Sequence, residues 1–144
     1  MKISHVEPVT LAIPFGYGVP GASRSNVKRL DFCLVRVETD QGLVGWGEAF
    51  SYNCRSAVAA AVRDMIAPLA LGRDAAERER LNGEIQKKLH IFGRFGITAF
   101  ALSGLDIALW DLAAKAAGAP LHRLLGGARR DRSEERRVGK ECRL

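Results

Sequence analysis

The stretch from Phe100 to Gly127 constrains the fold of this chain more than any other part of the sequence. Apolar residues recur in it at spacings of three and four, at Leu102, Leu105, Leu109, Leu112 and Ala116. This spacing places the five side chains on one face of an α-helix. Gly118 can adopt the left-handed conformation that ends a helix, and Pro120 cannot continue it. We therefore predict a long packing helix followed by a short apolar turn over residues 121–125, with no reactive group in it.

The N-terminal third of the chain has the period-two alternation of β-strands. It predicts strands over residues 2–14, 31–39 and 43–49, with Val9, Leu11 and Ile13 on one face of the first strand and Cys33, Val35 and Val37 on one side of the second. Asp40-Gln41-Gly42 supplies the turn between the last two strands. Pro8 cannot donate a ladder hydrogen bond, so the first strand has an edge or a bulge there.

Two further helices are predicted between these strands and the main helix. Ser56 can cap the first, which Pro68 and Gly72 bring to an end, and Asp74 with Glu77 forms a start like a capping box for the second. On the second helix the charged side chains, Arg78 among them, are expected to stay solvated. The predicted fold class is α+β, a three-stranded antiparallel meander followed by a bundle of helices.

Length and composition fit one soluble domain. The chain has 144 residues, of which 47% are hydrophobic, and a barrel enzyme would need roughly 250 residues for the barrel alone. Its N-terminus lacks the apolar core of a signal peptide, and no run of about 18 apolar residues predicts a membrane span, so a cytoplasmic protein is expected. The three cysteines are far apart and odd in number, which indicates free thiols and no zinc site.

The last thirteen residues differ from the rest of the chain. RSEERRVGKECR, from Arg132 to Arg143, has no apolar periodicity and resembles the translation of a sequencing-library adapter. We interpret residues 132–144 as a non-native tail and exclude them from the fold. They hold five basic and three acidic side chains, so without them the net charge falls from +6 to +4. A nucleic-acid binder is therefore the least favoured function, since the tail carries much of the basic character.

The main helix also carries a family resemblance. Ser103-Gly104-Leu105-Asp106, Asp111-Leu112, Lys115 and Leu124-Leu125-Gly126, with Gly45-Trp46-Gly47-Glu48 upstream, resemble the N-terminal domain of the mandelate racemase and muconate-lactonizing branch of the enolase superfamily. The resemblance implies a capping domain over residues 1–131, followed in the intact enzyme by a barrel that holds the acid/base residues and Mg²⁺. Such enzymes abstract a proton α to a carboxylate. Racemisation of a 2-hydroxy acid or dehydration of an acid sugar is then expected, and the fragment alone is expected to be inactive.

In that family two loops of the capping domain close over the substrate and exclude water. Mapped onto this chain they are residues 14–29 and 50–55. The implied substrate-binding residues are Tyr17, Val19, Arg24, Phe50, Tyr52 and Asn53. Arg24 or Lys28 could meet a carboxylate, although a solvated loop charge is the simpler interpretation of each. The implied partners are the barrel domain, a small carboxylate substrate and other copies of the enzyme, with no nucleic acid and no membrane.

Other patterns favour no chemistry. Gly16 to Gly21 matches G-x-G-x-x-G, but Pro20 removes a backbone donor and no amphipathic helix follows, so a dinucleotide site is disfavoured. Asp106 and Asp111 point about 140° apart on the helix and cannot act as a carboxylate pair. Glu48, the three histidines and both tryptophans are interpreted as structural or surface residues. No catalytic residue and no metal ligand is assigned. The alternative function is a stand-alone α+β module that binds a protein partner through an exposed apolar face.

Overall fold

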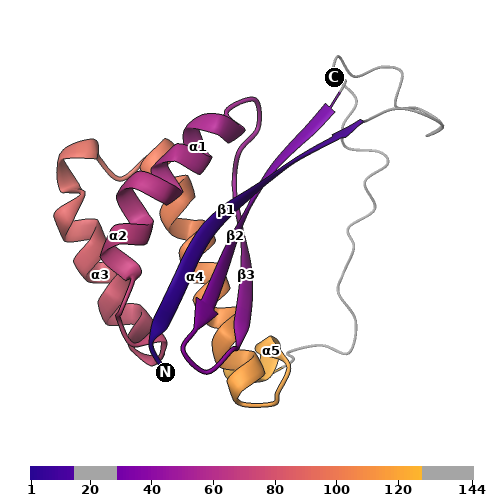
Figure 1. Cartoon of the computed structure of the whole chain (residues 1–144), viewed down its shortest axis with the longest axis vertical. Coiled ribbons are helices and arrows are strands. Elements are labelled where there is room, and N and C mark those ends of the chain that lie inside the picture. The colour runs from indigo at the N-terminus through magenta and orange to yellow at the C-terminus, as the bar shows by residue number, and fades with distance from the viewer. Residues whose placement is uncertain (15–28, 128–144) are drawn as a thin grey trace.

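The computed structural model describes residues 1–14 and 29–127. Along the chain the elements are β1 (Ile3–Pro14), β2 (Arg29–Thr39), β3 (Val44–Ala49), α1 (Arg55–Ala61), the π-helical η2 (Val62–Ile66), α2 (Ala67–Ala70), the 3₁₀ turn η3 (Ala75–Glu77), α3 (Arg78–Lys88), the 3₁₀ turn η4 (His90–Phe92), α4 (Ile97–Ala116) and α5 (Leu121–Leu124). The strands form one antiparallel sheet in the order β1-β2-β3. The predicted α+β class and meander are confirmed (Figure 1).

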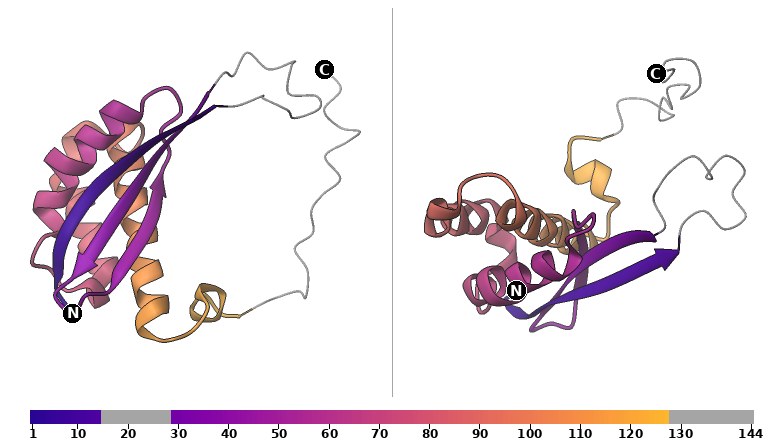
Figure 2. Two further views of the ribbon diagram at one scale, coloured as in Figure 1. Left: turned by 45° about the vertical axis from the view of Figure 1, so that its right-hand side comes forward. Right: turned by 90° about the horizontal axis from the view of Figure 1, so that it is seen from above.

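The helices cover one face of the sheet, and no described element covers the other (Figure 2). Cys33, Val35 and Val37 point to the helices and are fully buried, as their alternation predicts. On β1, Leu11 lies opposite Phe32 and Val9 opposite Leu34 in the register, which places the predicted apolar side of β1 on the outer face. Leu11 and Ile13 are accordingly exposed to solvent. The core therefore lies between the sheet and the helices.

The place of β1 at the edge of the sheet explains how this strand tolerates a proline. In the described sheet β1 pairs only with β2, so the missing amide hydrogen of Pro8 need not remove a ladder bond. The edge half of the prediction for Pro8 is thus confirmed. A shift in the register also occurs on β1, but it lies between Ile3 and His5 and not at Pro8.

Helix α4 packs on the sheet through small residues. A Cβ added to Gly47 would overlap the carbonyl oxygen of Gly104, and one added to Gly104 would lie 2.9 Å from the Cβ of Ala49. Backbone therefore meets backbone where α4 crosses β3. The buried face is broader than the predicted leucine stripe, since Ala101, Gly104, Ala108 and Ala114 are also buried. The stripe is also shorter than predicted, because Ala116 is exposed in the last turn.

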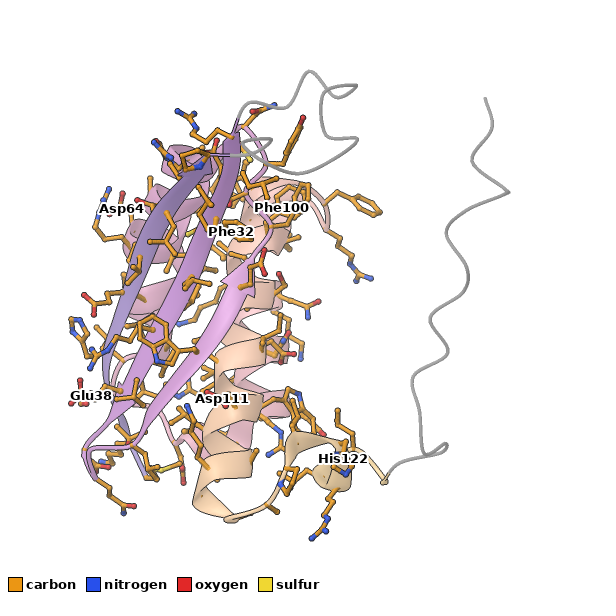
Figure 3. All side chains as sticks on the ribbon, turned by 90° about the vertical axis from the view of Figure 1, so that its right-hand side faces the viewer. Phe32, Glu38, Asp64, Phe100, Asp111 and His122 are labelled. Atoms are coloured by element: carbon orange, nitrogen blue, oxygen red, sulfur yellow. The ribbon has the colours of Figure 1, made fainter. Side chains whose placement is uncertain are left out.

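Two polar side chains of α4 bond the free side of β3. The carboxylate of Asp111 accepts hydrogen bonds from the Trp46 amide at 2.9 Å and from the Lys115 ammonium at 2.6 Å. The same ammonium donates to the carbonyl oxygen of Val44 at 2.8 Å. Asp111 lies beside β3 in Figure 3. The predicted Asp111–Lys115 pair exists, and its larger role is to satisfy an open strand edge that could otherwise pair with another chain.

Several local predictions for the helices need correction. Cys54, not Ser56, occupies the N-cap position of α1, and it makes no side-chain cap bond. Asp74 caps the 3₁₀ turn η3, where its carboxylate accepts from the Ala76 amide at 3.0 Å, whereas α3 has Glu77 at its N-cap position and no side-chain cap bond. Arg78 is half-buried, and its guanidinium lies 3.7 Å from the ring centroid of Trp110. That cation–π contact offsets the desolvation of Arg78, so Trp110 is a stacking platform as well as a packing residue.

By length and composition alone, α4 could cross a membrane. Its predominantly apolar sequence has another function in this fold, because eight of its residues are buried in the domain. A core helix of a soluble domain passes the same composition test.

Candidate functional site

The candidate site is the loop from Phe50 to Cys54, which connects β3 to α1. A turn closes it, since the amide of Cys54 donates to the carbonyl oxygen of Ser51 at 3.0 Å. Asn53 has φ +55°, the left-handed conformation that asparagine tolerates better than most residues. Tyr52 stands at the tip of this turn with 48% of its surface exposed. The loop therefore has one defined backbone shape and presents an aromatic side chain to solvent.

A buried carboxylate holds the base of this loop. The side chain of Asp31 is 4% exposed, and its Oδ1 lies 2.8 Å from Arg29 and 2.8 Å from Arg55. Next to it, the buried hydroxyl of Ser51 donates to the carbonyl oxygen of Asp31 at 3.1 Å. Asp31 thus connects the start of β2, the loop and the first turn of α1. Because both arginine partners neutralise it, burial of this charge is tolerated.

An aromatic contact holds the other side of the loop. The ring of Phe50 meets the ring of Phe100 edge to face, with 5.0 Å between centroids and 68° between planes. Phe100 belongs to the first turn of α4, where Figure 3 shows it near the upper end of the sheet. Edge-to-face pairs contribute about 0.5–1.5 kcal/mol beyond the area they bury. Phe50 remains 57% exposed, so it can contact a ligand while the core holds its position.

The structure brings three of the six predicted binding residues together. Phe50, Tyr52 and Asn53 share one loop, in which Asn53 shapes the backbone and the two aromatic residues are exposed. Tyr17, Val19 and Arg24 lie outside the described residues. The anchoring residues Asp31, Ser51 and Arg55 were missed. A signal for Asp31 existed, since it alternates with Cys33 and Val35 and so lies on the apolar side of the strand.

Comparison with known proteins identifies the family. Residues 6–126 match the sequence profile of the mandelate racemase / muconate lactonizing enzyme N-terminal domain. The chain belongs to this family. The match covers nearly all described residues, including the anchored loop and the α4–sheet contact, so the resemblance found on α4 extends over the whole domain.

Relatives within this enolase-superfamily branch include acid-sugar dehydratases. The chain is 41% identical over 102 residues to a D-galactonate dehydratase family member from Streptomyces bingchenggensis, covering 71% of this chain and 25% of that protein. It is 38% identical over 101 residues to the arabinonate dehydratase of Saccharolobus solfataricus, covering 70% and 27%. The chain thus spans about a quarter of the length of these relatives.

A solved structure supports the same assignment. The mandelate racemase/muconate lactonizing protein from Paracoccus denitrificans, complexed with magnesium, superposes with a TM-score of 0.71 at 34% identity. The match covers 90% of this chain and 31% of that protein. Magnesium is therefore a family feature, and the residues described in this chain can be compared with what Mg²⁺ needs.

The described part of this family member does not fit a magnesium site. Within residues 1–14 and 29–127, no three side chains among His, Cys, Asp and Glu gather where a cation could bind. The one deeply buried carboxylate of the loop region, Asp31, is already neutralised by two arginines. Mg²⁺ favours carboxylates that remain open to it and to water. We therefore derive no metal chemistry from the described residues.

The two described cysteines differ in reactivity. Both are free thiols, as predicted; Cys33 is buried and Cys54 half-buried, while Cys142 lies outside the described residues. Burial raises the pKa of the Cys33 thiol, and the nearby Cys54 raises it further. We expect iodoacetamide at pH 8 to alkylate Cys54 in the folded chain and Cys33 only after urea is added, as peptide mass spectrometry can show. Equal labelling of both in the folded chain would contradict this burial.

The same pKa shift has a consequence for stability at high pH. The thiol pKa of Cys33 is higher in the folded chain than in the unfolded one. The contribution of the protonated thiol to the free energy of unfolding is therefore fully present below the unfolded pKa of about 8.5. It is lost as the pH rises from there through the folded value. Above pH 9, we therefore expect the urea midpoint of unfolding to fall less steeply with rising pH in Cys33→Ala than in the unsubstituted chain.

Proposed function

We propose that this chain is the substrate-capping domain of a Mg²⁺-dependent acid-sugar dehydratase, and that the Phe50–Cys54 loop forms part of the wall of its active site. The proton-transfer groups and metal ligands would belong to the barrel domain, and the fragment alone would be inactive. We also propose a cytoplasmic location, as the N-terminal sequence leads us to expect, and assembly of the intact enzyme from several copies, as the family resemblance implies.

The main support for this proposal is that the loop exposes two aromatic side chains on an anchored backbone. A loop that recognises a substrate must present side chains to it and yet return to one geometry, since small misplacements weaken catalysis. Here Tyr52 and Phe50 are exposed, while Asp31, Ser51 and Phe100 hold the backbone beneath them. Dehydration is favoured over racemisation because the two relatives compared by sequence are a D-galactonate dehydratase family member and an arabinonate dehydratase.

A chimera can test the proposed role. Residues 1–127 of this chain would replace the matching region of the arabinonate dehydratase, which is 38% identical over 101 residues. We expect the chimera to dehydrate at least one five- or six-carbon sugar acid. Tyr52→Ala in the chimera is expected to lower kcat/KM about tenfold, mainly through KM, because it removes a contact made in both ground and transition states.

The matched control is Leu71→Ala, which truncates a side chain of similar exposure, 46% against 48% for Tyr52. Leu71 and Tyr52 lie at opposite ends of the sheet. Leu71 follows α2 and precedes Gly72, whose amide donates to the carbonyl oxygen of Ile3 at the start of β1, whereas Tyr52 follows the end of β3. We expect no change in kcat or KM for this variant. Equal effects of the two substitutions, or none from Tyr52→Ala, would count against the loop as a substrate wall.

A further inference from the structure

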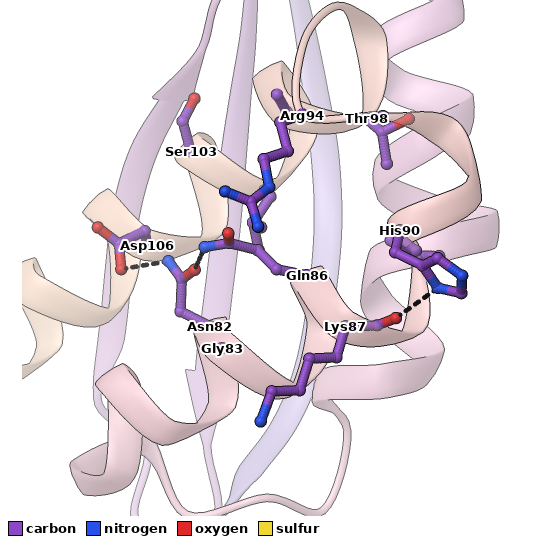
Figure 4. A pocket seen from close by; sticks show the side chains of 13 residues that line it. Asn82, Gly83, Gln86, Lys87, His90, Arg94, Thr98, Ser103 and Asp106 are labelled. Carbon is purple, nitrogen blue, oxygen red and sulfur yellow. Dashed lines mark hydrogen bonds between the residues drawn. The ribbon is translucent and has the colours of Figure 1, made fainter.

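A pocket of about 580 Å³ lies between α3, the η4 turn and the first half of α4. Its volume is in the range of small-molecule sites. Figure 4 shows its polar lining, which includes Asn82, Gln86, Arg94, Thr98, Ser103 and Asp106. None of these residues belongs to the Phe50–Cys54 loop, so the pocket is a separate feature of the domain.

One wall of the pocket is a chain of hydrogen bonds with a fixed direction. The side-chain amide of Gln86 donates to the Asn82 oxygen, and the Asn82 amide donates to one carboxylate oxygen of Asp106 at 2.9 Å. The chain links α3 to α4 and fixes which way each amide points. It leaves the Gln86 oxygen and the second Asp106 oxygen without a donor among the described residues. Both atoms can accept hydrogen bonds from hydroxyl groups.

A cation lies next to this wall. Arg94, in the segment between η4 and α4, extends over the pocket toward Gln86 (Figure 4). It forms no ion pair with a carboxylate in the described part of the chain, unlike Arg36, Arg73 and Arg80. A guanidinium presents paired donors that match a carboxylate. The pocket thus offers a donor for an acid group next to acceptors for hydroxyl groups.

A glycine in the pocket lining leaves free the space that a side chain would fill. Gly83 lies in the middle of α3 and lines the pocket, and a Cβ added there would meet nothing within 4 Å. Glycine destabilises a helix by about 0.5–1 kcal/mol relative to alanine. No neighbour in the described structure requires that loss. Close approach of a ligand to the α3 backbone gives a reason for it.

We propose that the pocket between α3 and α4 binds a small polyhydroxylated carboxylate, with its acid group on Arg94 and its hydroxyls on Asp106 and Gln86. A phosphate ion offers no string of hydroxyl donors for these acceptors, and a neutral polyol offers nothing for the guanidinium. This inference concerns a second binding site and does not depend on the proposed function of the loop.

The test is an NMR titration of the isotope-labelled 144-residue chain with gluconate, sorbitol and inorganic phosphate as probes. We expect saturable shifts for gluconate at the amides of Gly83 and Ser103 and at the side-chain amides of Asn82 and Gln86. Sorbitol and phosphate are each expected to bind at least about tenfold more weakly, because each lacks one of the two recognised groups.

Two variants and one control complete the test. Gly83→Leu fills the pocket from a position with open space and is expected to abolish binding, while Arg94→Met should weaken it about tenfold. Lys88→Met removes a neighbouring exposed charge outside the pocket lining and should leave binding unchanged. Absence of saturable shifts, equal binding of phosphate, or unchanged gluconate binding in Gly83→Leu would each overturn the proposal.

Discussion

Replacing Gly47 with alanine is expected to destabilise the chain by about 3 kcal/mol, a large part of the 5–15 kcal/mol that holds a typical domain together. The added Cβ would overlap the carbonyl oxygen of Gly104 and lie 2.6 Å from the amide nitrogen of Ala108. These are backbone atoms of α4 and cannot rotate away. The helix would have to lift from β3, which would open the core along Ala101, Leu105 and Ala108. Urea unfolding followed by circular dichroism measures the loss.

Gly83→Ala is the matched control for this prediction. It makes the same chemical change in a place where the new Cβ meets nothing within 4 Å. Because alanine favours the helix, we expect Gly83→Ala to stabilise the chain by about 0.5–1 kcal/mol. A loss of stability in Gly47→Ala together with a gain in Gly83→Ala would establish the close contact of α4 with the sheet. Equal small effects would show that α4 does not approach β3 as closely as described.

Replacing Asp31 with alanine is expected to cost about 2 kcal/mol, the second-largest effect. Its carboxylate is 4% exposed between Arg29 and Arg55, but the two arginines are 54% and 30% exposed. Water can therefore solvate both cations after the carboxylate is gone, which keeps the loss below that of a fully buried pair. Amide NMR relaxation should in addition show faster motion at Tyr52 and Asn53, since the loop loses its anchor.

The control for Asp31 is Asp64→Ala. Asp64 also pairs with an arginine at 2.8 Å, but that pair with Arg63 is 64% and 58% exposed. Exposed pairs contribute little, so we expect a change below about 0.5 kcal/mol and no effect on the loop. If both aspartate variants lost the same stability, the loop would not depend on the buried carboxylate.

Much of the fold could be predicted because the spacing of apolar residues in the sequence matches the side of each strand or helix that is buried. The alternation of Cys33, Val35 and Val37 identified the buried side of β2, and the leucine spacing identified the face of α4 that meets it. The extent of that face could not be predicted from leucines alone. Gly104 and Ala108 are buried because their small size lets α4 approach β3, which depends on glycines far away in the sequence.

The candidate site was predictable only in its exposed half. The family resemblance pointed to the loop that holds Phe50, Tyr52 and Asn53, whereas the residues that anchor this loop were missed. Asp31 is distant in sequence from Arg55, and only the pairing of β2 with β3 brings the two together. Likewise the bond from Lys115 to Val44 depends on where α4 crosses an open strand edge, which local spacing does not reveal.

Turnover of arabinonate by the chimera, measured beside the 144-residue chain in the same Mg²⁺ buffer, tests most directly whether this domain shapes an active site without supplying its chemistry. We expect the chimera to form the dehydrated product and the chain alone to form none above the buffer rate. Product formed by the chain alone, and lost on substitution of its own carboxylates, would contradict the proposed role.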